Sequence, residues 1–284
     1  MLEYALQGMM VTSLVCNGVA LGMILRQDTR QLDLKLALTM TLCDLILCFY
    51  KVGEAVYMGV GSGGSLDAQA GQWEGVVTTF LLQLSVVSVG FLAGLRFWVI
   101  FLKWKVNLRV WWAMLIIPQV VMLGLLIAVA LEGQFERVQL MATFYPSIQS
   151  RSPVVGLCRH LLMVSFVWPV VVLNFTYPCI ARLYESLLRQ MHPEEATCKQ
   201  RRTIYFKIIG FVLIYDTLMI PNLIILVMES ITNQPQSATL ESMAELALFS
   251  MTFFNPLVLL ALHHETLYEL KASLNRLKYK LLPF

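Results

Sequence analysis

The sequence predicts an all-α membrane protein, a bundle of seven transmembrane helices followed by a short amphipathic helix. Three observations indicate this fold class. Of the 284 residues, 58% are hydrophobic and only 14% are charged, whereas an average soluble domain has about 25% charged residues. The mean hydropathy of the whole chain is +0.69. Seven apolar runs each reach the roughly 20 residues that a membrane-spanning helix needs.

Each apolar run must form a helix, because a backbone inside lipid has to satisfy its own hydrogen bonds. The predicted helices form one domain over residues 1–284, and the chain has no repeat that would suggest an inverted-repeat transporter. In chain order they span about 6–25, 36–58, 76–102, 110–131, 155–184, 204–228 and 243–262.

The segments between the runs are typical of loops. A Gly/Ser stretch, Gly59–Gly64, follows the second run, and a Pro-containing segment, Glu132–Pro153, separates the fourth run from the fifth. Polar residues Ser230–Thr239 precede the seventh run. After that run, His263–Leu282 has leucines three or four residues apart and basic residues between them. This pattern predicts an amphipathic helix on the inner leaflet, where basic side chains meet anionic lipid.

The positions of lysine and arginine predict the orientation in the membrane. With the N-terminus outside, 16 of the 21 basic residues lie in cytoplasmic loops and the tail, and only Arg137, Arg151 and Arg159 lie outside. We therefore expect a multi-pass plasma-membrane protein with an outer N-terminus and a cytoplasmic C-terminus. The net charge of +3 is too small to indicate nucleic-acid binding.

Ionisable side chains inside the apolar runs are costly and indicate function. Asp44, Lys51 and Glu54 share one face of the second helix, because seven and three residues separate them. This face must point into the bundle, where Lys51 and Glu54 suit an internal ion pair as well as a binding site. Other runs hold further polar groups: Asn17, Ser85, Asp216 and Asn255.

An ordered set of motifs resembles that of the rhodopsin-like (class A) G-protein-coupled receptors. The resemblance covers nearly the whole chain, and the basic helix after the seventh run corresponds to the family's eighth helix. The motifs are Asn17 in the first helix, Leu-Cys-Asp44-Leu in the second, Arg96 at the end of the third, Pro169 with Tyr177 in the fifth, Pro221 in the sixth and Asn255-Pro256 in the seventh.

The resemblance implies a polar core in the middle of the bundle. Asp44, Ser85 and Asn255 occupy the positions that form a sodium site in such receptors, and Asn17 braces that site through hydrogen bonds between helices. A carboxylate with nearby hydroxyl and amide oxygens suits a hard cation. Sodium is the only metal ion that the resemblance implies, and no other cofactor is expected.

The resemblance also implies an activation switch at the inner end. Arg96 would lie near Tyr177, where a heterotrimeric G protein docks. Pro169, Pro221 and Pro256 would bend their helices, because proline removes a backbone hydrogen bond. Without the other motifs, Arg96 would be interpreted as a cation that extends to the lipid headgroups.

Several positions depart from the family pattern. Leu95 replaces the acidic neighbour of the arginine, Met219 replaces the tryptophan before the sixth-helix proline, and Leu259 replaces the tyrosine after Asn-Pro. No cysteine lies near the outer end of the third helix, so the usual disulfide to the second outer loop cannot form. The resemblance is therefore to a divergent member of the family.

The class of ligand follows by elimination. Phe249 stands where opsins carry the retinal-binding lysine, so we expect no retinal pigment, and Thr78 stands where amine receptors place an aspartate. The predicted pocket consists of Thr78, Lys51, Glu54 and Glu245, although Glu245 equally suits a solvated acid at a loop edge. An acidic mouth attracts cations. We expect a small-molecule, lipid or short peptide ligand, with cations favoured.

Three classes of function are compared. The motif set predicts a signalling receptor whose partners are this ligand, membrane lipids and a heterotrimeric G protein, with no nucleic acid. The alternative is an ion or small-solute transporter or channel that uses the polar face of Asp44, Lys51 and Glu54. An enzyme is not expected, because His263-His264-Glu265 lacks the spacing of a His-Glu-x-x-His metal site.

Overall fold

The computed structural model describes residues 2–26, 32–60, 68–102, 107–137, 144–191 and 196–262. Seven helices in this part of the chain are long and apolar enough to cross a membrane, which confirms the all-α seven-helix bundle of a multi-pass membrane protein. The predicted amphipathic helix 263–282 lies outside the described residues. The helices are α1 (Leu2–Ile24), α2 (Leu32–Val60), α3 (Ala68–Arg96), α4 (Leu108–Leu131), α5 (Pro153–Met191), α6 (Ala196–Thr232) and α7 (Ala238–Leu262).

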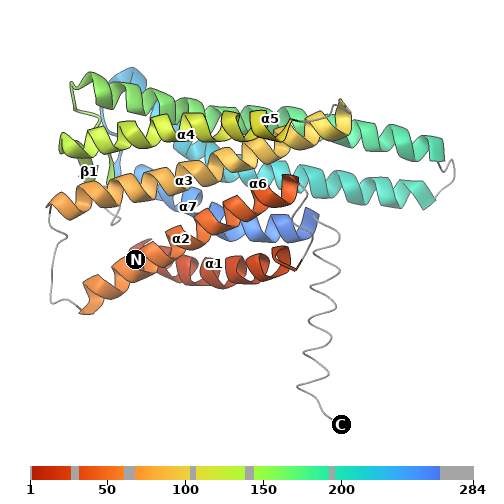
Figure 1. Cartoon of the computed structure of the whole chain (residues 1–284), viewed down its shortest axis with the longest axis horizontal. Helices are drawn as coiled ribbons and strands as arrows, with labels where there is room; N and C mark the ends of the chain where they lie inside the picture. Colours follow the sequence, from red (N-terminus) through yellow and green to blue (C-terminus); the bar gives the residue numbers. More distant parts are fainter. Residues whose placement is uncertain are drawn as a thin grey trace, which may run out of the picture.

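The helices pack so that neighbours in the chain lie side by side and α1 returns to contact α7 (Figure 1). The central helix is α3, which contacts α2, α4, α5 and α7 and is the most deeply buried of the seven. Close approach of α3 to α5 depends on Gly90. A Cβ atom on Gly90 would lie 3.0 Å from the Cα atom of Pro169, so even an alanine requires a backbone shift.

Two helices extend beyond their apolar runs. The sequence places their membrane-spanning parts at about 155–184 and 204–228, whereas α5 continues to Met191 and α6 begins at Ala196. Both extensions project past the other helices at one end (Figure 1). Hydrophobicity reports where lipid ends, but residues such as Glu, Arg, Gln and Lys continue a helix readily in water. A π-helical turn, η1 (Phe97–Phe101), likewise prolongs α3.

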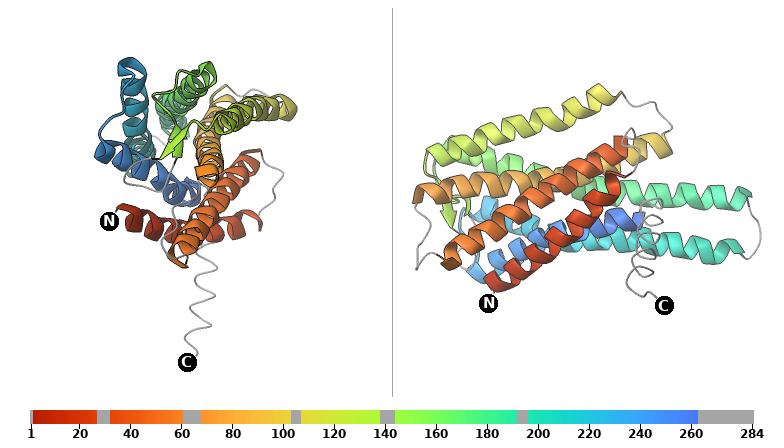
Figure 2. Two further views of the ribbon diagram at one scale, coloured as in Figure 1. Left: turned by 90° about the vertical axis from the view of Figure 1, so that its left-hand side faces the viewer. Right: turned by 60° about the horizontal axis from the view of Figure 1, so that its bottom comes forward.

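A short β-hairpin lies at the other end of the bundle, where the sequence indicates only a loop. Strand β1 (Phe135–Arg137) pairs antiparallel with β2 (Phe144–Pro146), and Glu136 is opposite Tyr145. Seen from this end, the hairpin lies between α3 and the α6–α7 pair (Figure 2). We call this end the hairpin end and the opposite one, at which α3 reaches Arg96, the Arg96 end.

Glycines on α3 hold the hairpin in place. Gly71 and Gly75 leave room for the rings of Phe144 and Phe135, which a Cβ atom on either glycine would overlap. The side chain of Gln72 accepts a hydrogen bond from the Phe135 amide at 2.8 Å and donates one to its carbonyl at 3.0 Å. The hairpin is therefore a fixed part of the bundle.

Polar groups lie inside the bundle and large apolar side chains cover its outside. Ile117, Val120 and Val121 of α4 are exposed, whereas Asp44 and Asn17 are completely buried. The apolar exterior, with these polar groups at depth, differs from the surface of a water-soluble domain. Lipid is the solvent that suits such a surface.

Candidate functional site

A hydrogen-bonded polar cluster lies in the core, where α2, α3 and α7 meet. The Ser85 hydroxyl donates to one oxygen of Asp44 at 2.7 Å, and the Asn255 amide donates to the other at 2.8 Å. Asn255 also donates to the Ser85 hydroxyl at 3.0 Å. The three residues that the sequence assigns to a sodium site are thus brought together, and their oxygens suit a hard cation. Sodium binding itself stays a prediction.

The fourth predicted core residue, Asn17, links α1 to α7. Pro256 has no backbone N–H, so the carbonyl four residues earlier, that of Thr252, loses its helical donor. The Asn17 amide donates to this Thr252 carbonyl at 2.7 Å. Asn17 therefore braces α7 one turn from Asn255, through the backbone and not through Asp44.

The polar contacts continue from the core towards the Arg96 end. The Tyr215 hydroxyl of α6 donates to Asn255 at 2.5 Å, and Arg96 donates to the Tyr177 hydroxyl of α5 at 3.1 Å. A cavity of about 10 Å³ lies between these two pairs, which is roughly the space of one water molecule. Arg96 therefore faces the interior with Tyr177. Tyr215 is the link that the sequence did not single out, although a buried tyrosine in an apolar run usually has a hydrogen-bond partner.

The three prolines of the predicted switch all lie inside helices. They are Pro169 in α5, Pro221 in α6 and Pro256 in α7. Pro169 lies against α3 at Gly90, and Pro256 exposes the carbonyl that Asn17 uses. Pro221 lies six residues beyond Tyr215, so a bend in α6 at this point would move the Tyr215 hydroxyl relative to α7.

A second ionic cluster occupies α2 and α3 nearer the hairpin end. The buried Lys51 ammonium pairs with Glu54 at 3.0 Å and with Glu74 of α3 in a shorter contact. The internal ion pair that the sequence allowed for Lys51 and Glu54 is present, with Glu74 as a further partner. Thr78 is buried one turn from Glu74, and its hydroxyl has no hydrogen-bond partner within the described residues.

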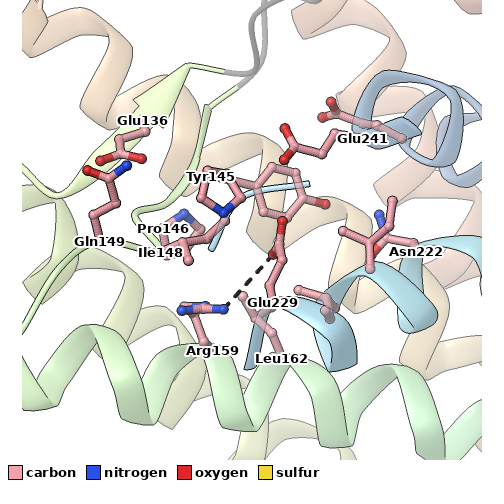
Figure 3. Close-up of a pocket in the computed structure, with 14 residues that line it drawn as sticks. Glu136, Tyr145, Pro146, Ile148, Gln149, Arg159, Leu162, Asn222, Glu229 and Glu241 are labelled. Carbon is pink, nitrogen blue, oxygen red and sulfur yellow. Dashed lines mark ion pairs between the residues drawn. The ribbon is translucent and has the colours of Figure 1, made fainter. Parts of the chain in front are cut away.

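The predicted ligand pocket is divided between two places. Lys51, Glu54 and Thr78 belong to the region of the ionic cluster, whereas Glu245 lines a separate cavity of about 200 Å³ at the hairpin end. The cavity is enclosed by α5, α6, α7 and the hairpin (Figure 3). The sequence did not assign most of its polar lining to a pocket. Glu241 was expected to be a solvated acid at a loop edge, Asn222 lies inside α6, and the others lie in the segment between α4 and α5 or near helix ends: Glu136, Tyr145, Gln149, Arg159 and Glu229.

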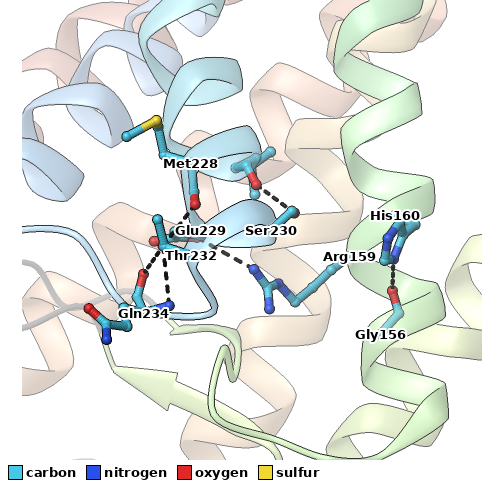
Figure 4. A network of polar contacts seen from close by, with 9 residues as sticks. Gly156, Arg159, His160, Met228, Glu229, Ser230, Thr232 and Gln234 are labelled. Atoms are coloured by element: carbon cyan, nitrogen blue, oxygen red, sulfur yellow. Dashed lines mark hydrogen bonds and ion pairs between the residues drawn. The ribbon is translucent and has the colours of Figure 1, made fainter.

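Polar contacts at the end of α6 hold one wall of this cavity (Figure 4). Thr232 donates to the Met228 carbonyl at 2.8 Å and accepts from the Gln234 amide at 3.3 Å. In the same turn of α6, Glu229 forms an ion pair with Arg159 of α5 at 4.0 Å. The end of α6 is therefore tied both to its own following loop and to α5.

Comparison with known proteins does not assign this site. No protein-family model matches the chain, and no curated protein matches it. Its function therefore has to be inferred from the chemistry and geometry of the site, together with the resemblance of its motifs.

Proposed function

We propose that the protein is a signalling receptor similar to the rhodopsin-like G-protein-coupled receptors. It binds a small-molecule, lipid or short peptide ligand in the outer half of the bundle and acts on a heterotrimeric G protein at the inner face. The observation that carries this proposal is a pair of polar contact sets that line one small cavity: Asp44 with Asn255 and Tyr215, and Arg96 with Tyr177.

Such polar contacts are costly in a membrane and have no use in an inert anchor. The first set joins α2, α3 and α7 to α6 through Tyr215, and the second joins α3 to α5 across the cavity. A bundle that changes between two states needs polar contacts of this kind. They form in one arrangement of the helices and are replaced by other contacts in the second arrangement. In this proposal, ligand binding at the hairpin end shifts α6 and α7 and opens the Arg96 end.

The distribution of basic residues supports the direction of signalling. In the topology that the sequence predicts, 16 of the 21 lysines and arginines belong to the loops and tail on one side, and the positive-inside rule places that side, the side of the Arg96 end, in the cytoplasm. In the plasma membrane the hairpin end would then face outward to receive the ligand. The extensions of α5 and α6 would project towards the G protein.

The proposal is tested with the full chain in lipid nanodiscs and a panel of purified heterotrimeric G proteins. We expect nucleotide exchange that Arg96→Ala reduces at least about tenfold, a loss of about 1.4 kcal/mol in coupling. Arg109→Ala is the matched control, because Arg109 is an exposed cation at the same end. The absence of exchange with every G protein, or equal losses in both variants, would contradict the proposal.

Transport along the polar face of α2 is the second candidate. This face divides into an Asp44 cluster and a Lys51 cluster, so a cation moving along it would have to pass a buried ammonium group. The cation would have to displace an ammonium that already pairs with Glu54 and Glu74, and this disfavours a cation path. Ion flux into liposomes that Asp44→Asn abolishes, together with no nucleotide exchange, would favour transport over signalling.

A further inference from the structure

The cavity at the hairpin end combines an apolar wall with several hydrogen-bonding groups, the composition of a small-molecule site. Its volume of about 200 Å³ is below the range of about 300–1,000 Å³ that drug-sized ligands occupy. The occupant should therefore be compact. The apolar wall consists of Pro146, Ile148, Leu162, Ile225, Leu226 and Pro235.

The charged groups that line the cavity are predominantly acidic. Four glutamates line it, namely Glu136, Glu229, Glu241 and Glu245, whereas Arg159 is the one cationic side chain among the described lining residues. Arg159 pairs with Glu229 at 4.0 Å. The arginine thus offsets only part of the acidic charge, and a site walled by low-dielectric groups concentrates the field that remains.

Two of these acids lie side by side on different helices. The carboxyl groups of Glu229 on α6 and Glu241 on α7 lie near each other, and both residues line the cavity (Figure 3). Carboxylates at this separation repel each other. A bound cation would remove that repulsion and would join α6 to α7.

A buried amide supplies a separate indication of a ligand. Asn222 is 6% exposed, and its side chain lies beside Tyr145 of the hairpin (Figure 3). Its side-chain oxygen is buried and has no hydrogen-bond partner within the part of the chain that the structure describes. Buried acceptors are nearly always satisfied. This oxygen therefore calls for an N–H or O–H donor from the cavity.

Tyr145 of the hairpin forms the remaining wall. Burial and the nearby Glu245 raise the pKa of the Tyr145 hydroxyl well above its usual range, so the ring stays neutral at physiological pH. The face of a neutral tyrosine ring attracts cations. Acids, an amide oxygen and an aromatic face are all groups that favour the same kind of partner.

We propose that this cavity binds a small organic ammonium ion, a primary or secondary amine on a compact apolar body. Glu241, Glu245 and the Asn222 oxygen are the acceptors for its two or three N–H groups, and the apolar wall contacts the body. The inference rests on the proposed function in one respect, because it treats this cavity as the ligand site of the receptor. An amine there bridges α6 and α7 at the end remote from Arg96.

The test measures binding to the purified full chain in nanodiscs by calorimetry and thermal shift. The probes are 2-phenylethylamine, the neutral 2-phenylethanol and the anion phenylacetate, which share one apolar body and differ in charge. We expect saturable binding of the amine and no binding of the alcohol or the anion. This comparison uses the wild-type protein, so it does not depend on any variant folding.

The variants then locate the site. Glu245→Gln and Glu241→Gln should each weaken amine binding at least about tenfold, whereas Glu132→Gln, an exposed acid at the same end outside the cavity, should leave it unchanged. Equal binding of amine and alcohol, or equal effects of Glu245→Gln and Glu132→Gln, would overturn the inference.

Separate readouts distinguish this inference from the proposed function. Amine binding without nucleotide exchange on any G protein would support the cavity and contradict signalling. Nucleotide exchange without binding of 2-phenylethylamine would support signalling and overturn the amine site.

Discussion

Asp44 has both carboxylate oxygens hydrogen-bonded, one to Ser85 and one to Asn255, at the centre of a membrane-spanning bundle. A buried charge held this way still lacks a counter-charge, since both partners are neutral. A monovalent cation bound beside it would supply that charge. Sodium binding at Asp44, which stays a prediction, would link the stability of the protein to the ion composition of the buffer.

We predict that sodium stabilises the protein through Asp44. In NaCl the melting temperature should exceed that in matched choline chloride, because sodium at about ten times its Kd would add about 1.4 kcal/mol. Asp44→Asn should abolish the difference. Asp216→Asn is the control and should retain the difference. Asp216 is an acid on α6 that accepts a hydrogen bond from Asn174 of α5. A sodium effect that survives Asp44→Asn would contradict the assignment.

Asn17 is the second residue whose contribution to the stability of the bundle can be predicted. Asn17→Ala leaves the Thr252 carbonyl buried without a donor, because Pro256 cannot supply one. We expect a loss of about 1–3 kcal/mol in the free energy of unfolding, measured by thermal unfolding in detergent. Thr12→Ala serves as control, since the exposed Thr12 hydroxyl donates only to a carbonyl of its own helix. Equal losses in the two variants would refute the bracing role.

At the scale of elements, α3 and α5 come into close contact at Gly90. Gly90 permits it, and the neighbour across the contact is the backbone of Pro169, which cannot rotate away as a side chain would. The contact lies between the polar core and the Arg96 end, five residues beyond Ser85 on α3. A shift of α5 there would also move the wall of the cavity that Arg159 and Leu162 form.

We predict that Gly90→Ala destabilises the bundle by about 1–3 kcal/mol, the usual effect of overpacking. Gly124→Ala is the matched control. The exposed Gly124 has nothing within 4 Å of an added Cβ atom, so alanine should be neutral or slightly stabilising there. Thermal unfolding of both variants checks this. A stable Gly90→Ala variant would show that α3 and α5 are not tightly packed.

The elements also show where inference from sequence succeeded. All seven helices were predicted, because a run of about 20 apolar residues has one stable structure in lipid. The hairpin was not. Its strands have three residues each and depend on Gly71 and Gly75 of α3 for the space that their phenylalanines occupy. Contacts between segments so far apart leave no periodic pattern in either one.

For the molecule as a whole, the orientation in the membrane can be tested directly. Glu132→Cys lies at the hairpin end, and Ser186→Cys lies on the extension of α5 at the Arg96 end; both residues are exposed. We predict that a membrane-impermeant maleimide added to intact cells labels Glu132→Cys above the wild-type background. Ser186→Cys should be labelled only after the cells are permeabilised. The reverse pattern would invert the topology.

The sequence by itself determined the seven helices, the expected orientation and the identity of the core residues Asp44, Ser85 and Asn255. Lipid makes these properties local, because each polar group at depth is costly wherever its helix lies. Only the tertiary structure decided which helix faces meet. It added Tyr215 to the core contacts, paired Lys51 with Glu74, and separated Glu245 from the other predicted pocket residues. Helix rotation and packing set those choices, and they depend on all seven helices together.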